Sequence, residues 1–342
     1  MTSVLVTGGS GAIARWCTVE LLRRGFDVRT TVRNPTREAE VRASIATQVD
    51  PPLDRLTFYS ADLLRDDGWA TAVEGAQHVL HIASPFPPGP PKHQDELIVP
   101  ARDGTVRVLR ASVAAGVERV VVTSSAAAIA YGPVPPGGTY TENEWSDPTS
   151  PQTPAYARSK TIAERAAWEF METSAGATSL AVVNPTLVVG PVLGEDPSYS
   201  FQSISRLLAG DMPMIPRLGF NFVDVRDIAD LHVRAMTAPN AAGQRFIGKG
   251  TFAWLADVAR ILRERLGPEA RKVPTRVAPD VLVRFLALFD PSLRGVAEDL
   301  GDRTEFSNAK ARTELGWQPR PLDDTVVDTA RSLLASGLVR VN

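Results

Sequence analysis

The chain opens with a glycine-rich string between an apolar run and an amphipathic segment. The apolar run is Ser3-Val4-Leu5-Val6, and the string Thr7-Gly8-Gly9-Ser10-Gly11-Ala12-Ile13-Ala14 follows it at once. Residues 13–24 then carry apolar side chains at helical spacing, and Gly25 is a typical helix stop. Residues 27–32 are rich in β-branched side chains and predict a second strand. The chain is thereby constrained to begin as strand, glycine turn, helix and strand.

This arrangement favours a dinucleotide-binding turn. Gly8 and Gly11 allow the backbone to turn tightly and to approach a pyrophosphate, while the free N–H groups of the following helix point at its charge. Ala14 is small enough for close packing of the helix on the strand. The alternative is a tight turn that binds no ligand.

Arg33 ends the second predicted strand and bears on the choice of cofactor. An acid at that position would hydrogen-bond the ribose 2′-hydroxyl of NAD, whereas an arginine accommodates the 2′-phosphate of NADP(H). Arg37 is a possible second contact. The alternative is that Arg33 is one more solvated loop arginine in an arginine-rich chain.

Composition sets limits on the class of protein. The 342 residues are 44% hydrophobic and 22% charged, with a net charge of −2, which is ordinary for a globular protein and favours no nucleic acid or membrane partner. We expect no signal peptide and a cytoplasmic location, because a strand begins at once and no run approaches the ~20 apolar residues of a membrane span. Cys17 is expected in the core, and we expect no metal, because the four histidines show no ligand spacing. These are His78, His81, His93 and His232.

The alternation of strands and helices continues along the chain. Further strands are predicted at 56–61, 79–83, 119–125 and 179–184, and helices at 69–74, 95–115 and 154–172. Together with the first two strands they predict a Rossmann-type doubly wound parallel sheet.

A smaller lobe is expected after the sheet. We predict an NADP-binding Rossmann domain at 1–185, to which 221–238 returns, and a mostly helical C-terminal substrate lobe made of 186–220 and 239–342. Within that lobe 251–302 has helical spacing, and 323–336 predicts a last amphipathic helix.

Tyr156 and Lys160 are four residues apart near the start of a predicted helix, so they share one face. A free tyrosine titrates near ~10, and a neighbouring ammonium favours the phenolate, so we expect Lys160 to lower the pKa of Tyr156 toward neutrality. Ser124 and Ser125 close the strand before this helix, where a hydroxyl can stabilise negative charge on a substrate oxygen. The alternative for either serine is a strand-end cap.

Several segments together resemble the extended short-chain dehydrogenase/reductases. The glycine string, TSSA at 123–126 and YARSK at 156–160 carry this resemblance. Further segments are similar to the branch that holds dihydroflavonol 4-reductases, cinnamoyl-CoA reductases and methylglyoxal or ketone reductases. These are TVRNP at 31–35, HIASPF at 81–86, ENEWSD at 142–147, KTIAERAAWEF at 160–170, NPTLVVGP at 184–191 and FVDVRDIAD at 222–230.

The resemblance implies roles for particular residues. It implies a catalytic triad of Ser125, Tyr156 and Lys160, since the second serine of TSSA is the family's catalytic one. The cofactor set that we expect is Thr7, Gly8, Ser10, Gly11, Ala12, Ile13, Arg33, Asp62, Leu63, Ala83, Ser84, Tyr156, Lys160 and Pro185. The substrate-pocket candidates are Phe86, Ile129, Tyr131, Tyr199 and Phe201.

The predicted function is reduction of a ketone or aldehyde by NADPH, with Tyr156 as proton donor. A nucleotide-sugar epimerase or dehydratase on the same fold, and a non-catalytic NADP sensor, are the alternatives. The cinnamoyl-CoA reductases carry an Asn-Trp-Tyr-Cys-Tyr string where this chain has Pro154-Ala155-Tyr156-Ala157-Arg158, so their activity is not implied. We expect a small-molecule carbonyl as substrate, and a monomer or homodimer.

Overall fold

The computed structural model describes residues 2–49, 53–85, 93–174, 176–194, 199–290 and 293–340. Its contacts group the chain into two compact units, each assembled from three stretches of sequence. The first unit is Met1–Thr186, Val225–Gly248 and Phe306–Gln318, and the second is Leu187–Asp224, Lys249–Glu305 and Pro319–Asn342.

The first unit is built on a seven-stranded parallel sheet, which confirms the predicted fold class. Its strand order is β10-β7-β5-β4-β1-β2-β3. The strands are β1 (Ser3–Val6), β2 (Asp27–Val32), β3 (Leu56–Ser60), β4 (His78–His81), β5 (Arg119–Thr123), β7 (Ser179–Pro185) and β10 (Gln244–Gly248). Six of them match predicted strands, whereas β10 was not predicted.

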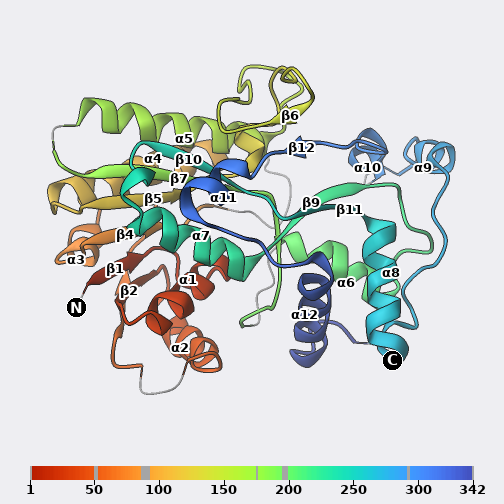
Figure 1. Ribbon diagram of the computed structural model, residues 1–342, viewed down its shortest axis with the longest axis horizontal. Coiled ribbons are helices and arrows are strands. Elements are labelled where there is room, and N and C mark those ends of the chain that lie inside the picture. Colours follow the sequence, from red (N-terminus) through yellow and green to blue (C-terminus); the bar gives the residue numbers. More distant parts are fainter. Residues whose placement is uncertain are drawn as a thin grey trace. The chain divides into compact units, whose positions relative to one another are not determined.

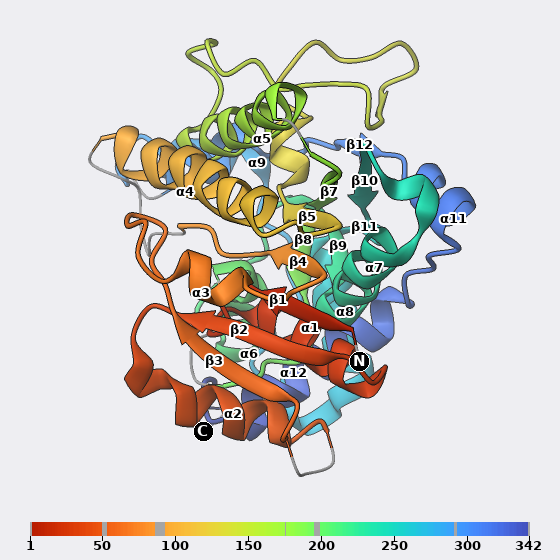
Figure 2. The same ribbon diagram turned by 90° about the vertical axis from the view of Figure 1, so that its left-hand side faces the viewer.

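Helices cover both faces of this sheet (Figures 1 and 2). One face carries α1 (Ala12–Arg23), α2 (Glu38–Ala46), α7 (Val225–Thr237) and α11 (Ala309–Leu315). The other carries α3 (Trp69–Val73), α4 (Asp95–Ala114) and α5 (Ala155–Thr173). Short elements complete the unit: η1 (Pro35–Arg37), η2 (Ala126–Ala128), η4 (Pro239–Ala241) and β6 (Thr139–Tyr140).

The strand sequences follow from this double cover. In β5 the residues from Val120 to Thr123 are all buried, because a parallel sheet between two helix layers leaves neither side of a strand in water. Val79, Val120 and Val122 pack with Trp69 and Leu109 in one core cluster. Each such side chain contributes roughly 1.5–3 kcal/mol when it leaves water, so this core holds the strand ends in fixed places.

The second unit contains a small mixed sheet. β8 (Leu187–Val189) runs parallel to β9 (Gly219–Asp224), and β11 (Thr251–Trp254) runs antiparallel to β9. Its helices are α6 (Gln202–Ala209), α8 (Leu255–Leu266), α9 (Asp280–Leu286), α10 (Arg294–Glu298) and α12 (Leu322–Ala335), with η3 (Tyr199–Phe201) and η5 (Gly267–Ala270). The two-residue β12 (Glu305–Phe306) lies where the chain leaves this unit.

The helical prediction for 251–302 holds only in part, because α8 ends at Leu266 and the shorter helices η5, α9 and α10 follow it separately. Residues 251–254 were predicted to be helical but form β11, and the helix begins only at Leu255. Pairing with β9 decides this, since Phe252 lies opposite Asn221, and the rings of Phe252 and Trp254 pack edge to face at 5.2 Å. Of the segment 221–238, which we predicted to return to the Rossmann domain, α7 lies in the first unit and β9 in the second.

Among the residues that the structure describes, no helix is both long and apolar enough to span a membrane.

Candidate active site

The predicted site residues lie at the carboxyl edge of the parallel sheet. Gly8 follows β1, Ala83 follows β4 and Ser125 follows β5, while Pro185 ends β7. These four strands are neighbours in the sheet, so their ends meet along one edge (Figure 2). Ligands of doubly wound sheets bind at this edge.

At Gly8 and Gly9 the turn lies so close to neighbouring segments that a side chain at either position would not fit. Gly8 has φ +73°, and a Cβ there would lie 3.0 Å from the Cα of Ala83. A Cβ on Gly9 would lie 2.3 Å from the hydroxyl of Thr30. The amide of Gly11 donates to the carbonyl of Gly8 at 2.8 Å, which closes the turn. The cradle suits the close approach of a pyrophosphate.

Helix α1 starts at this turn and offers its N-terminus. Gly11 is the N-cap residue, and no side chain caps the helix. The first turn, which includes the predicted contacts Ala12 and Ile13, therefore presents its N–H groups without a competing acceptor from the cap. Ser10 is held beside it, because its carbonyl accepts from Nε of Arg15 at 3.2 Å.

Thr7 fixes the loop that follows β4. Its hydroxyl oxygen accepts from the amides of Ile82 and Ala83, each at 3.0 Å. With both lone pairs occupied, the hydroxyl donates to Nδ1 of His81 at 2.9 Å. Burial lowers the pKa of His81 to about 3, so the ring is neutral and carries its proton on Nε2.

Arg33 lies directly after β2 and is exposed. Within the described part of the chain its guanidinium makes no hydrogen bond or ion pair. Arg37, the possible second contact, differs, because it pairs with Glu40 at 2.9 Å. Among the described residues, the guanidinium of Arg33 thus remains available after β2.

Asp62 and Leu63 follow β3 in the chain, and their contacts are with neighbouring residues of the same unit. The carboxylate of Asp62 accepts from the amide of Leu64 at 3.0 Å, and its carbonyl accepts from Nε1 of Trp69 at 3.0 Å. Leu63 packs against Gly104 of α4, where a Cβ would lie 2.9 Å from the Cβ of Leu63.

Ser125 and Tyr156 are brought together by the fold. Ser125 has extended backbone dihedrals of φ −160° and ψ 152°, and its hydroxyl accepts from the amide of Ala127 at 3.1 Å. Tyr156, in the first turn of α5, hydrogen-bonds the Ser125 side chain. Two hydroxyl groups therefore converge on one point at the sheet edge.

The pKa of Tyr156 does not move as we predicted. Burial around its hydroxyl raises the pKa of Tyr156, and the hydrogen bond to Ser125 opposes that rise only in part. The predicted lowering by Lys160 is not found. The amine of Lys160 lies 6.0 Å from the centre of the Tyr156 ring, and burial of the hydroxyl outweighs any field at that range.

Lys160 is buried one helical turn after Tyr156. Its amine donates to the carbonyl of Thr123 at 3.4 Å. Burial lowers the pKa of Lys160 to about 8, and the carboxylate of Glu164 works against that fall. The ammonium is thus the main form at neutral pH, but with a small margin.

Ser124 and Ser125 have different surroundings. Ser124 is buried and donates its hydroxyl to the carboxylate of Glu164. Ser125 is partly exposed and faces Tyr156. The geometry thus favours Ser125 over Ser124 as the substrate contact.

The predicted pocket residues are scattered. Ile129 is fully buried in a cluster with Tyr140 and Ile247, so it has no surface to offer a substrate. Tyr131 is exposed and borders a hollow of about 300 Å³. Phe201 is buried in the second unit. Phe86 and the side chain of Tyr199 lie outside the described residues.

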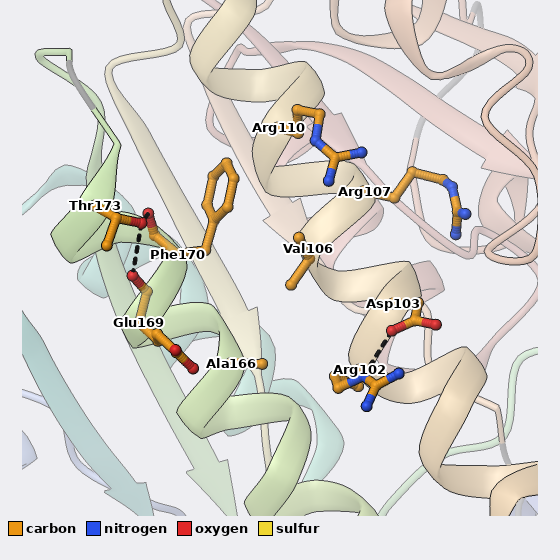
Figure 3. A pocket seen from close by; sticks show the side chains of 9 residues that line it. All are labelled: Arg102, Asp103, Val106, Arg107, Arg110, Ala166, Glu169, Phe170 and Thr173. Carbon is orange, nitrogen blue, oxygen red and sulfur yellow. Dashed lines mark hydrogen bonds and ion pairs between the residues drawn. The ribbon is translucent and has the colours of Figure 1, made fainter.

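A hollow of about 460 Å³ between α4 and α5 contains none of the predicted residues (Figure 3). Arg102 pairs there with Asp103 at 2.6 Å, and Val106 and Phe170 face each other across it. Neither the glycine turn nor the Ser125 and Tyr156 hydroxyl groups border this hollow. No group of three potential metal ligands occurs among the described residues either.

Comparison with known proteins places this geometry in a family. The model of the NAD dependent epimerase/dehydratase family matches residues 4–247. The chain belongs to this family. It is 32% identical over 335 residues to a cinnamoyl-CoA reductase of Medicago truncatula, which covers 96% of this chain and 95% of the relative. It is 34% identical over 271 residues to tetraketide alpha-pyrone reductase 2 of Arabidopsis thaliana, covering 78% and 83%.

Solved structures agree with the family. The methylglyoxal/isovaleraldehyde reductase Gre2 of yeast, complexed with NADPH, superposes with a TM-score of 0.80 at 26% identity, covering 99% of this chain and 100% of Gre2. Gre2 of Candida albicans, also complexed with NADPH, gives 0.81 at 26% identity, covering 98% and 99%. The resemblance to extended short-chain reductases that the motifs predicted is thereby confirmed.

Sequence reasoning missed the residues that surround the family's tyrosine and lysine. Glu164 and Asn184 lie within segments that carried the resemblance, but no role was attached to them. Arg245 had no local signal, because it acts through the unpredicted strand β10. The signal that could have found this group is the acid Glu164, which follows Lys160 by one helical turn on the predicted helix.

Proposed function

We propose that this protein is an NADPH-dependent carbonyl reductase, which converts a ketone or aldehyde to an alcohol. The observation that carries the proposal is the convergence of Ser125 and Tyr156, with Lys160 one turn further along α5, at the sheet edge where the glycine turn lies. A proton donor and a hydrogen-bond donor that meet beside a nucleotide cradle suit the reduction of a polarised C=O group.

Each residue has a distinct part. When bound, NADPH supplies the hydride that reaches the carbonyl carbon. The Ser125 hydroxyl donates a hydrogen bond to the carbonyl oxygen and stabilises its growing negative charge. The Tyr156 hydroxyl gives its proton to that oxygen, and the raised pKa of Tyr156 keeps this proton in place until the substrate needs it. The Lys160 ammonium can donate to the ribose hydroxyls of the bound cofactor.

Several features of the first unit support NADP(H) as the cofactor. The cradle at Gly8 and Gly9 leaves room only for backbone, and the uncapped start of α1 suits a pyrophosphate. Arg33 is placed after β2 with its guanidinium available for a 2′-phosphate. The two Gre2 structures with NADPH add weight to this assignment.

A substrate with an apolar part fits the second unit. A cavity of about 470 Å³ within that unit is walled by Met212, Met214, Leu218, Phe220 and Leu286 among others. Such a lining favours aliphatic or aromatic groups. Leu187, which also borders it, follows the predicted cofactor contact Pro185 by two residues.

The family name itself keeps one alternative in view, a nucleotide-sugar epimerase or dehydratase. Those reactions retain a bound nicotinamide and usually favour NAD, for which an acid at the end of β2 is expected. Arg33 occupies that position here. A protein that only senses NADP would need neither Tyr156 nor Lys160.

One assay separates these functions. Purified protein is mixed with a panel of ketones and aldehydes and NADPH, and cofactor oxidation is compared with alcohol formation. We expect the two to be equal for at least one partly apolar carbonyl. Conversion of a nucleotide sugar without net cofactor oxidation would favour the epimerase or dehydratase, and NADPH binding without any turnover would favour the sensor.

A further inference from the structure

Glu164 is a fully buried acid whose carboxylate is completely engaged. It lies one helical turn after Lys160 on α5. Its Oε1 accepts from Nε of Arg245 at 2.6 Å. Its Oε2 accepts from Nδ2 of Asn184 at 2.8 Å and from the hydroxyl of Ser124. Burying an ion pair is costly unless its hydrogen bonds are satisfied. Both carboxylate oxygens of Glu164 have donors, whereas Nη2 of Arg245 and Oδ1 of Asn184 have no hydrogen-bond partner among the described residues.

Two of these partners lead to Ser125. The Nδ2 of Asn184 also donates to the carbonyl of Ser125, at 3.2 Å. Ser124 is its direct neighbour in the chain. The carboxylate of Glu164 is therefore linked to the side chain that precedes Ser125 and, through Asn184, to the backbone carbonyl of Ser125.

Arg245 extends the cluster to the segment before α5. Its Nη1 donates to the carbonyl of Glu142 at 2.7 Å and to that of Glu144 at 2.9 Å. Its guanidinium lies 3.8 Å from the centre of the Trp145 ring. One arginine from the edge strand β10 thus holds both the buried acid and the loop 142–145.

The carboxylate also acts on Lys160 through space. A small cavity of about 10 Å³, enough for one water molecule, is bordered by Lys160, Glu164, Ser124 and the neutral His81. The remaining walls are uncharged and come from the loop after β4 and from α4, β5 and α5. Among the described residues around this cavity, Glu164 is the acid that faces the ammonium, and it raises the pKa of Lys160 against burial.

We propose that Glu164, held by Arg245, is a positioning residue of the reductase, which fixes the backbone at Ser125 and places a carboxylate one turn from Lys160. This inference rests on the proposed function. It extends the catalytic group beyond serine, tyrosine and lysine to a buried pair that touches neither cofactor nor substrate.

The test compares Glu164→Gln with the paired variant Glu164→Gln/Arg245→Met. The single change leaves a buried cation unpaired and can prevent folding, whereas the pair removes both charges and keeps an amide oxygen for Ser124 and Asn184. The matched control is Glu264→Gln/Arg260→Met, which removes an exposed pair of 2.9 Å on α8. Each variant is assayed for melting, NADPH affinity, and the pH dependence of kcat.

We expect the paired variant to fold and bind NADPH while kcat falls about 10–100-fold, because a neutral amide oxygen holds Ser124 and Asn184 less firmly than a carboxylate and the loop 142–145 loses Arg245. Without the carboxylate the pKa of Lys160 is lower, so activity should decline at a lower pH than in the wild type. A merely structural role would lower melting but leave the pH profile in place. The control variant on α8 should leave both kcat and its pH profile unchanged.

An unchanged kcat and pH profile in a folded paired variant would overturn the inference. If that variant does not fold, Ser124→Ala decides instead, since it removes one contact without touching a charge; kcat should then fall about 2–10-fold at unchanged NADPH affinity, and no fall refutes the proposal. An active Tyr156→Phe would refute the proposed function itself, so the two failures are distinguishable.

Discussion

The two ends of the candidate cofactor site are organised in opposite ways. At the catalytic end, Ser125, Tyr156 and Lys160 are joined to protein partners and backed by the buried Glu164. At the other end, Arg33 is exposed, and its guanidinium makes no hydrogen bond or ion pair with a described residue.

This difference separates rate from selectivity. Groups that stabilise a transition state work best when they are fixed before the substrate arrives. A residue that distinguishes one cofactor from another can instead gain its partner from the ligand, since an arginine pairs readily with a phosphate. Changes at the catalytic end should therefore lower kcat, and changes at Arg33 should alter KM.

The largest effect is expected for Tyr156→Phe. The variant keeps the ring and Lys160 but loses the proton donor, so kcat should fall by about 10²–10⁴-fold. NADPH affinity, measured by fluorescence titration, should remain nearly intact. If the variant kept more than half of the wild-type kcat, the catalytic end would not be what we propose.

Tyr131→Ala tests whether substrate preference can be changed without changing either the Ser125, Tyr156 and Lys160 group or Arg33. We expect it to re-rank a ketone panel by bulk, with shifts of about 10–200-fold, while activity toward the smallest aldehyde changes less. Phe86→Ala is expected to act in the same way.

Ile129→Val is the matched control, because Ile129 is fully buried two residues away. It should cost about 0.5–1.5 kcal/mol of stability and lower all activities together. A parallel fall of all activities in Tyr131→Ala as well would show that its ring contributes to stability and not to the choice of substrate.

Arg33→Ala addresses the exposed end. The wild type should prefer NADPH over NADH, and the variant should lose about 10–150-fold of that preference, mainly through KM, as one charge-assisted contact is removed. Steady-state kinetics with both cofactors measure it. Equal use of NADPH and NADH by the wild type would contradict the assignment whatever the variant does.

The smallest effect concerns pH. Burial lowers the pKa of Lys160 to about 8, so its ammonium is lost as pH rises through that value. NADPH binding to the free enzyme should therefore weaken above pH 8, by up to about tenfold per pH unit. Titrations between pH 7 and about 9.5 measure this. In Lys160→Met, NADPH affinity should no longer vary with pH over this range. If NADPH affinity of the wild type did not fall above pH 8, the proposed role of the ammonium would be contradicted.

The parts that the sequence predicted well depend on short-range pattern. β1, α1 and β2 follow one another directly, and the four-residue spacing of Tyr156 and Lys160 gives them one helix face. The cofactor edge then follows from how parallel strands must meet.

The parts that could not be predicted depend on distant partners. β10 joins the sheet through β7, about sixty residues earlier in the chain. Residues 251–254 continue the helical spacing of α8, yet pairing with β9 makes them a strand. The pKa of Tyr156 follows burial, which no local pattern around Lys160 encodes.

The late position of Arg245 has a consequence for biosynthesis. Glu164 is made 81 residues before its cation, so a nascent chain that has not yet reached β10 carries an acid whose buried place in the fold has no counter-charge. Closing the core around an unpaired carboxylate costs several kcal/mol. The helix that holds Tyr156 and Lys160 should thus settle only after residue 245 has emerged, and a shortened chain ending at Gly243 should not form a stable nucleotide-binding unit.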